Sequence, residues 1–275
     1  MVFHQDFILK LLEKNQQKIF FLQILLRKAI YAKLNIKIKI KKKNKLKNYK
    51  NKKHKITKIS RLQHQSLFSY DEFLANCSAD RVQKIIWKYE LFKMVQNIPG
   101  DIVECGVHKG SGIYLYAKLL KIFKPNSLVK VVGFDFFGKA QKINNKYKID
   151  FKVNQNHTGN GSKKNEIIKN LNSFGINNVK LISGDVCITT KEYVKKNIGF
   201  RISMLILDVD NYEGTLECLK NLYNNVTRGG IIVLDEYALE KYGESDAVDE
   251  FLKDKKLKIR SEPWSSTPSA YIIKE

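Results

Sequence analysis

Two stretches of the chain carry acidic side chains directly after runs of apolar residues. Asp208 and Asp210 follow one run, and Asp235 and Glu236 follow the next. If the two runs are neighbouring parallel strands, about 4.8 Å apart, these acids converge at one edge of a sheet. Carboxylates that close repel one another unless they share protons or a cation, and hard oxygen ligands suit Mg²⁺ or another divalent ion. The pattern predicts a divalent-cation site, with helix caps and exposed loop acids as the alternative.

A second group of residues has the types expected around a nucleoside. Gly106, Gly110 and Gly112 follow an apolar run and precede a helical pattern, so the chain can turn tightly and a ligand can approach the backbone. Their spacing differs from the G-x-G-x-x-G of dinucleotide enzymes. Asp135 ends the next run, where a carboxylate can accept both hydroxyls of a ribose, and Asp185 follows the third run, where an adenine amino group could be held. The alternatives are a tight strand-to-helix turn, a helix cap and a Gly-Asp turn.

These residues belong to a regular alternation of strand and helix patterns. Strands are predicted over residues 102–105, 130–134, 179–182, 203–207 and 230–234, and helices over 111–123, 166–174, 191–196, 215–224 and 247–255. The alternation predicts an α/β fold with a seven-stranded, mostly parallel sheet and helices on both faces. Residues 256–260 and 270–273, with no helix between them, are expected to form an antiparallel C-terminal edge hairpin. Ligands of such sheets bind at the carboxyl ends of the strands, where the acids and glycines lie.

The first sixty residues differ in composition from the rest. They hold 18 of the 50 Lys and Arg and two of the 27 acids, a net +16 of the chain's +23. Residues 4–31 have the apolar spacing of an amphipathic helix, and 33–58 contain thirteen lysines in low-complexity sequence. We therefore expect a basic extension over 1–60, a helical cap over 61–97 and a main domain over 98–275. The extension is expected to be a solvated tether, with an anionic membrane surface or nucleic acid as alternative partners.

Several classes of protein are excluded or disfavoured. The four cysteines are far apart and include no C-x-x-C pair, which argues against structural zinc and indicates a reducing compartment. The longest uncharged apolar run near the N-terminus, residues 19–26, is far shorter than the roughly 18–20 residues that span a bilayer. Charges interrupt the region where a signal peptide would need an unbroken apolar stretch. We expect a cytoplasmic protein, with the inner face of the membrane as an alternative location through residues 1–60.

Residues 98–275 resemble the class I S-adenosylmethionine-dependent methyltransferases of the macrocin O-methyltransferase (TylF-like) family. The matching segments, in order, are PGDIVECGVHKGSG, GFDFF, ISGDV, LDVDNYEGTLECLKNLY, GGIIVLDEY, GESDAVDEF and PWSSTPSAYIIK. That family methylates sugar hydroxyls and needs a divalent metal. The resemblance therefore implies a Rossmann-like fold and a metal-assisted O-methyltransferase whose cofactor is S-adenosyl-L-methionine.

The resemblance also implies which residues bind each group. The methionine side of the cofactor is expected against Glu104, Gly106 and Gly110, its ribose on Asp135, and its adenine near Asp185. Three neighbours complete the predicted cofactor site: Ser111, Phe136 and Val186. Mg²⁺ or another divalent cation is expected on Asp208, Asp235 and Glu236. The family often has two Asp in the last pair, so the longer Glu236 departs from its pattern.

Asp210 is the predicted general base, and Asp208 acting as both ligand and base is the alternative. His108 and His157 are weaker candidates. The acceptor is expected to be a hydroxyl of a nucleotide sugar, a glycan or a glycosylated natural product, and the lysines of segment 138–165 would suit a phosphorylated or nucleotide-linked sugar.

Competing functions remain open from the sequence. One is a nucleic-acid-binding protein or RNA methyltransferase that uses the basic segment, and another is a non-catalytic membrane-associated scaffold. The acid cluster argues against nucleic acid, because without metal it would repel phosphates. A homo-oligomer is also open.

Overall fold

The computed structural model describes residues 69–138, 146–148, 150 and 161–275. The chain divides into two compact units, Met1–Asn76 and Cys77–Glu275. In the first unit the described residues 69–76 form a helix. The helix predicted over 4–31, the lysine-rich segment and His157 lie outside the described residues.

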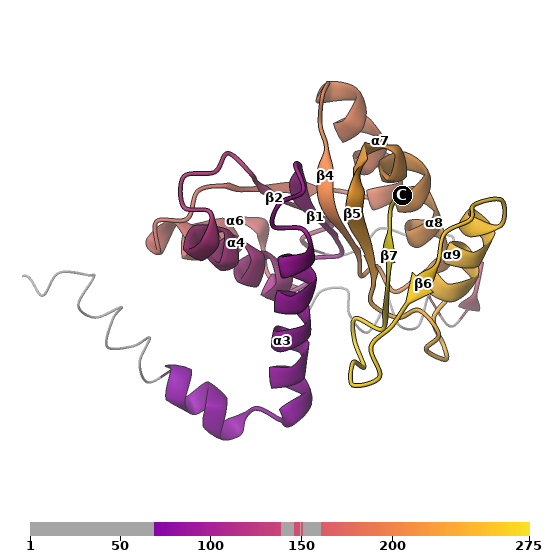
Figure 1. Ribbon diagram of the computed structural model, residues 1–275. Helices are drawn as coiled ribbons and strands as arrows, with labels where there is room; N and C mark the ends of the chain where they lie inside the picture. The colour runs from indigo at the N-terminus through magenta and orange to yellow at the C-terminus, as the bar shows by residue number, and fades with distance from the viewer. Residues whose placement is uncertain (1–68, 139–145, 149, 151–160) are drawn as a thin grey trace, which may run out of the picture. The chain divides into compact units, whose positions relative to one another are not determined.

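The second unit is built on a seven-stranded sheet (Figure 1). From one edge to the other its strands are β3 (Val179–Ser183), β2 (Val131–Asp135), β1 (Asp101–Cys105), β4 (Ile202–Leu207), β5 (Val226–Leu234), β7 (Ala270–Ile273) and β6 (Ile259–Arg260). The first five of these are parallel, and β7 pairs antiparallel with both β5 and β6. The predicted α/β fold with an antiparallel C-terminal edge is therefore confirmed.

Helices cover both faces of this sheet. On one face lie α3 (Ala79–Met94), α4 (Ser111–Phe123) and α6 (Lys164–Ser173), and on the other lie α7 (Val186–Lys196), α8 (Tyr212–Leu222) and α9 (Glu244–Leu252); a short 3₁₀ turn, Tyr223–Asn225, precedes β5. Figure 1 shows α4 and α6 on the opposite side of the sheet from α8 and α9. Because both faces are covered, the central strands are largely apolar, and β4 is buried along its whole length.

Alternation along the strands assigns each side chain to one of two cores. Ile102, Met204 and Val233 pack with α3, α4 and α6, whereas their neighbours Val103 and Leu205 pack with α7, α8 and α9. The same alternation directs Glu104 of β1 toward the face that α3 covers, and continued past the ends of β4 and β5 it directs Asp208 and Asp235 there as well.

The helix α3, part of the predicted cap over 61–97, packs onto the sheet. Trp87 and Leu91 are buried in its core, and the Trp87 indole N–H donates a hydrogen bond to the Pro268 carbonyl at 2.9 Å. Lys84 and Lys88 flank Trp87 on the same side of the helix and so face the sheet. This packing brings two cations to strand ends that carry acids.

Four helices, α6 to α9, begin earlier than predicted, and in two of them a side chain caps the first turn. The Asp185 carboxylate accepts from the Cys187 backbone N–H at 2.9 Å and starts α7 at Val186. The Asn211 side chain accepts from the Gly214 N–H at 2.6 Å and starts α8 at Tyr212. Capping of this kind satisfies backbone donors that have no partner within the helix. Among the described residues, no helix is long and apolar enough to cross a membrane.

Candidate active site

A cavity of about 530 Å³ opens at the carboxyl ends of the parallel strands. The strand order reverses between β1 and β4, where open α/β sheets form their ligand crevice. The predicted site residues that line the cavity are Gly106, Ser111, Asp135, Phe136, Asp185, Val186, Asp208, Asp210, Asp235 and Glu236. The connection from β1 to α4, residues 106–110, is called the glycine connection. It shares one cavity with the acids that follow β4 and β5.

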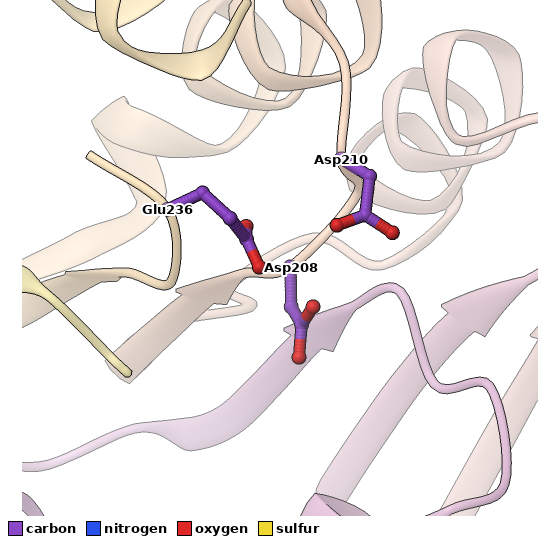
Figure 2. Close-up of side chains that lie close together, drawn as sticks. All are labelled: Asp208, Asp210 and Glu236. Carbon is purple, nitrogen blue, oxygen red and sulfur yellow. The ribbon is translucent and has the colours of Figure 1, made fainter. Parts of the chain in front are cut away.

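Three carboxylates from two neighbouring connections approach one another in this cavity (Figure 2). One oxygen each of Asp208, Asp210 and Glu236 lies within 4.8 Å of the other two. The register explains the approach: the Asp208 N–H bonds to the Cys105 carbonyl at 2.9 Å, and the Asp235 N–H bonds to the Leu207 carbonyl at 3.1 Å, which brings the ends of β4 and β5 level. The cluster contains Asp210 in place of the predicted Asp235.

Burial and mutual repulsion govern the protonation of these acids. Burial raises the pKa of Asp208 well above its usual range, and the neighbouring charge of Asp235 raises it further. Burial, followed by the charges of Asp208 and Asp235, likewise raises the pKa of Glu236. Such upward shifts mark a shortage of positive charge around the carboxylates.

The donor set fits a hard divalent cation. Oxygens that bind one Mg²⁺ at the usual 2.1 Å lie at most about 4.2 Å apart, and one oxygen from each cluster acid already lies within 4.8 Å of the other two. Glu236 Oε2 and Asp235 Oδ1 are buried and have no hydrogen-bond partner among the described residues. Buried carboxylate oxygens without donors are costly unless a cation or proton compensates them.

Asp235 is paired with a cation supplied by α3. Its Oδ2 lies 3.0 Å from the Lys84 ammonium, and its side chain is 3% exposed. One turn further along α3, the buried Lys88 ammonium lies 3.9 Å from Glu104 Oε1. Burial lowers the pKa of Lys88, but the surrounding carboxylates, Glu104 foremost, outweigh it and raise that pKa above its usual value. Lys84 and Lys88 thus offset part of the acidic charge.

Glu104 lies behind the glycine connection and does not line the cavity. It is 2% exposed and lies against the first turn of α4, where a Cβ on Gly112 would come within 1.7 Å of Glu104 Oε1. Burial raises the pKa of Glu104 to about 7, although Lys88 acts in the opposite direction. Glu104 thus packs on the side of the glycine connection away from the cavity. Its predicted contact with the cofactor stays a prediction. Gly110 also lies outside the cavity lining, as the residue before α4.

The glycine connection is held against the ends of β2 and β4. Asp135 Oδ2 accepts from the Val107 and His108 backbone N–H groups at 2.7 and 2.8 Å, and Oδ1 accepts from the Phe137 N–H at 2.8 Å. Gly106 has a φ of +89°, and a Cβ there would lie 1.6 Å from the Asp208 carbonyl oxygen. Asp135 therefore has a structural role in this loop in addition to its predicted ribose contact.

Strained backbone is concentrated at this edge of the sheet. His108, Phe137 and Asp210 have φ values of 48°, 52° and 58°, and they follow β1, β2 and β4, respectively. Non-glycine residues adopt this region at an energetic cost and do so most often at functional sites. The strain supports the placement of a site here.

The structure adds residues that the sequence reasoning missed. Lys84, Arg81 and Tyr242 line the cavity, and the fully buried Glu244 accepts from the Glu236 backbone N–H at 3.1 Å. Lys84 and Lys88 are four residues apart, on the side of α3 that carries Trp87 and Leu91. That spacing could have predicted two lysines that face the sheet. Glu244 carried no such signal.

Asp150 is a further unpredicted residue, in the long segment between β2 and α6. Its side chain is fully buried, and it accepts from the Tyr212 and Gly243 backbone N–H groups at 2.9 and 3.0 Å. It thereby joins the start of α8, next to Asp210, to the loop that carries Tyr242. A buried aspartate in lysine- and asparagine-rich sequence leaves no pattern by which to find it.

Comparison with known proteins places the chain in a family. The sequence profile of the family described as macrocin-O-methyltransferase (TylF) matches residues 17–263. Two curated relatives from Streptomyces are similar. The 8-demethyl-8-(2,3-dimethoxy-alpha-L-rhamnosyl)-tetracenomycin-C 4'-O-methyltransferase of S. olivaceus is 24% identical over 57% of this chain and 64% of its own length. The demethyldecarbamoylnovobiocin O-methyltransferase of S. niveus is 26% identical over 56% and 59%. The chain thus spans about three fifths of the length of these relatives.

Solved structures share the fold. The calicheamicin methyltransferase CalS11 superposes with a TM-score of 0.63 at 24% identity, covering 74% of this chain and 85% of that one. The O-methyltransferase NovP superposes with a TM-score of 0.58 at 22% identity, covering 68% and 78%. At these identities the likeness confirms the fold.

Proposed function

The chain belongs to the macrocin O-methyltransferase (TylF) family, and from that premise we propose that it transfers a methyl group from S-adenosyl-L-methionine to a sugar hydroxyl with the help of a divalent cation. One observation carries the proposal. The acids Asp208, Asp210 and Glu236 and the glycine connection after β1 line the same cavity. A cofactor on the connection and an acceptor at the acids would then be adjacent, and alignment of the reacting groups supplies much of the rate acceleration in such a transfer.

The residues proposed to bind the cofactor follow three neighbouring strands. Gly106 and Ser111 line the cavity after β1, Asp135 and Phe136 after β2, and Asp185 with Val186 after β3. Asp135 already accepts three backbone hydrogen bonds, and its two oxygens retain lone pairs for ribose hydroxyls. Asp185 uses Oδ1 for its helix cap, so Oδ2 is the atom proposed to face the adenine.

The residues toward the cation are Asp208 and Glu236, with Asp210 or Asp235 as the third acid. A bound divalent cation would act as a Lewis acid that lowers the pKa of the acceptor hydroxyl. Asp210 is the proposed general base, since its carboxylate lies in the cluster and lines the cavity. In this role Asp210 would accept the proton of the acceptor hydroxyl, and the bound cofactor would supply the methyl group and leave as the neutral thioether S-adenosylhomocysteine.

The proposed acceptor is a sugar within a nucleotide sugar, a glycan or a glycosylated natural product. The two curated relatives are named for methylation of a rhamnosyl-tetracenomycin and of a novobiocin precursor, which favours the glycosylated natural product. Arg81 at the cavity wall would also suit an acceptor that carries a phosphate.

The experiment is a methyl-transfer screen over nucleotide sugars, glycans and glycosylated natural products, with and without EDTA. Asp208→Asn should lower turnover by at least about a hundredfold while leaving S-adenosylhomocysteine affinity within about twofold, because Asp208 is proposed to hold the cation and not the cofactor. Glu217→Gln removes an exposed acid from α8 and is the matched control. Full turnover of the wild type in EDTA would reject the role of the cation.

A further inference from the structure

Lys84 extends from α3 toward the acid cluster. Its ammonium lies 3.0 Å from Asp235 Oδ2 and its side chain is 25% exposed, whereas the Asp235 side chain is 3% exposed. Lys84 lines the cavity, so it borders the space that a cation would enter. The partner carboxylate is fixed and buried, and the lysine is the half of the pair that can move.

Asp235 lies next to the cluster, and one of its two oxygens, Oδ2, is already engaged by the Lys84 ammonium. Its other oxygen, Oδ1, is buried with no hydrogen-bond partner among the described residues. Asp235 precedes the cluster acid Glu236 in the chain, and its negative charge acts on Asp208. The carboxylate thus belongs electrostatically to the cluster while its Oδ2 is occupied by an ammonium.

From this arrangement we infer that Lys84 competes with the divalent cation for Asp235 and thereby lowers the affinity of the site for metal. The inference rests on the proposed function. A monovalent ammonium and a divalent cation repel each other at a few ångström, so full coordination by Asp235 requires Lys84 to withdraw. With Lys84 in place, the three cluster acids hold the cation; with Lys84 displaced, Asp235 is added to them.

Lys88 does not have this role. It is buried, does not line the cavity and lies 3.9 Å from Glu104. Lys88 is thus a permanent counter-charge beneath the glycine connection, whereas Lys84 is an exchangeable one at the cavity wall. Arg81, one turn before Lys84 on α3, also lines the cavity, but its guanidinium lies 3.6 Å from the exposed Asp80 and gives a matched control.

The test is calorimetric titration of the full chain with Mn²⁺, without cofactor or acceptor, so that activity is not the readout. Lys84→Met should bind Mn²⁺ about tenfold more tightly than the wild type, because the positive charge that competes for Asp235 is removed. Lys84→Arg should stay within about twofold of the wild type since the charge is retained, and Arg81→Met should also stay within about twofold because its charge is paired elsewhere. Lys84→Gln repeats the neutral change should the methionine variant fail to fold.

Each outcome decides the inference. Mn²⁺ affinity of Lys84→Met and Lys84→Gln equal to or weaker than that of the wild type would overturn the competition while leaving the proposed metal site in place. An equal gain of Mn²⁺ affinity in Arg81→Met would show that any loss of positive charge at the cavity has this effect, and it would also overturn the competition by Lys84. Absence of Mn²⁺ binding in every variant would overturn both the inference and the proposed role of the cation.

Discussion

Replacement of Glu104 by Gln should change the pH dependence of stability in a calculable way. Glu104 is 2% exposed, and burial raises its pKa from 4.5 to about 7 in the folded chain. The folded state therefore binds this proton more tightly than the unfolded state does. As pH rises from 4.5 through 7, the wild type loses the associated stability, and a glutamine, which does not titrate, cannot lose it.

The magnitude follows from the shift. Each tenfold change in an ionisation constant corresponds to about 1.4 kcal/mol, so the rise from 4.5 to about 7 corresponds to about 3.4 kcal/mol over the whole window. Between pH 5 and pH 8 the wild type should lose about 2.5 kcal/mol relative to Glu104→Gln. Loss of the partner of Lys88 adds a further offset between the two proteins, so the prediction rests on the change of the difference with pH and not on its absolute value.

The assay is urea unfolding of both proteins in EDTA at pH 5, 6, 7 and 8. The raised pKa values of Asp208, Glu236 and Glu244 steepen both curves and cancel to first order in the difference. Glu192→Gln, which removes an exposed acid from α7, controls for general charge effects. A difference that stays constant from pH 5 to pH 8, or that favours the wild type as pH rises, would refute the reasoning.

Three further predictions concern the cofactor loop, the unpredicted aspartate and the basic extension. Asp135→Ala should weaken S-adenosylhomocysteine binding about ten- to a hundredfold, through lost charge-assisted hydrogen bonds of roughly 1.5–3 kcal/mol; unchanged affinity by calorimetry in a folded variant would contradict the ribose assignment. Asp150→Ala leaves the Tyr212 and Gly243 backbone N–H groups without their acceptor and should destabilise the fold by roughly 1–3 kcal/mol for each donor. Gly243→Ala should act in the same direction, since its Cβ would lie 2.5 Å from Asp150 Oδ2; urea midpoints equal to the wild type would count against this contact. A chain of residues 61–275 should keep turnover on a small acceptor and lose salt-dependent binding to RNA or anionic vesicles, and lost turnover with an intact fold would place the extension in the active site.

The sequence by itself determined the order of the elements and the edge at which the site lies. Apolar runs of strand length that alternate with helical patterns leave little choice but a doubly covered, mostly parallel sheet. The acids and glycines directly follow those runs, so they necessarily lie at the carboxyl ends of the strands. The quoted segments also identified the family, which the match over residues 17–263 confirms. Each of these inferences depends on neighbours along the chain.

The tertiary structure alone decided which charges meet. Asp235 was predicted beside Asp208 and Glu236; it lines the same cavity as both, and the structure adds an ion pair with Lys84, which lies 151 residues earlier. The position of Lys84 depends on how α3 packs onto the sheet through Trp87, a contact between distant segments that local patterns do not encode. Asp150 is likewise defined by backbone donors at Tyr212 and Gly243. Packing decides which charged groups come within a few ångström of one another. The free energy of a buried charge depends on every group around it and not on its place in the sequence.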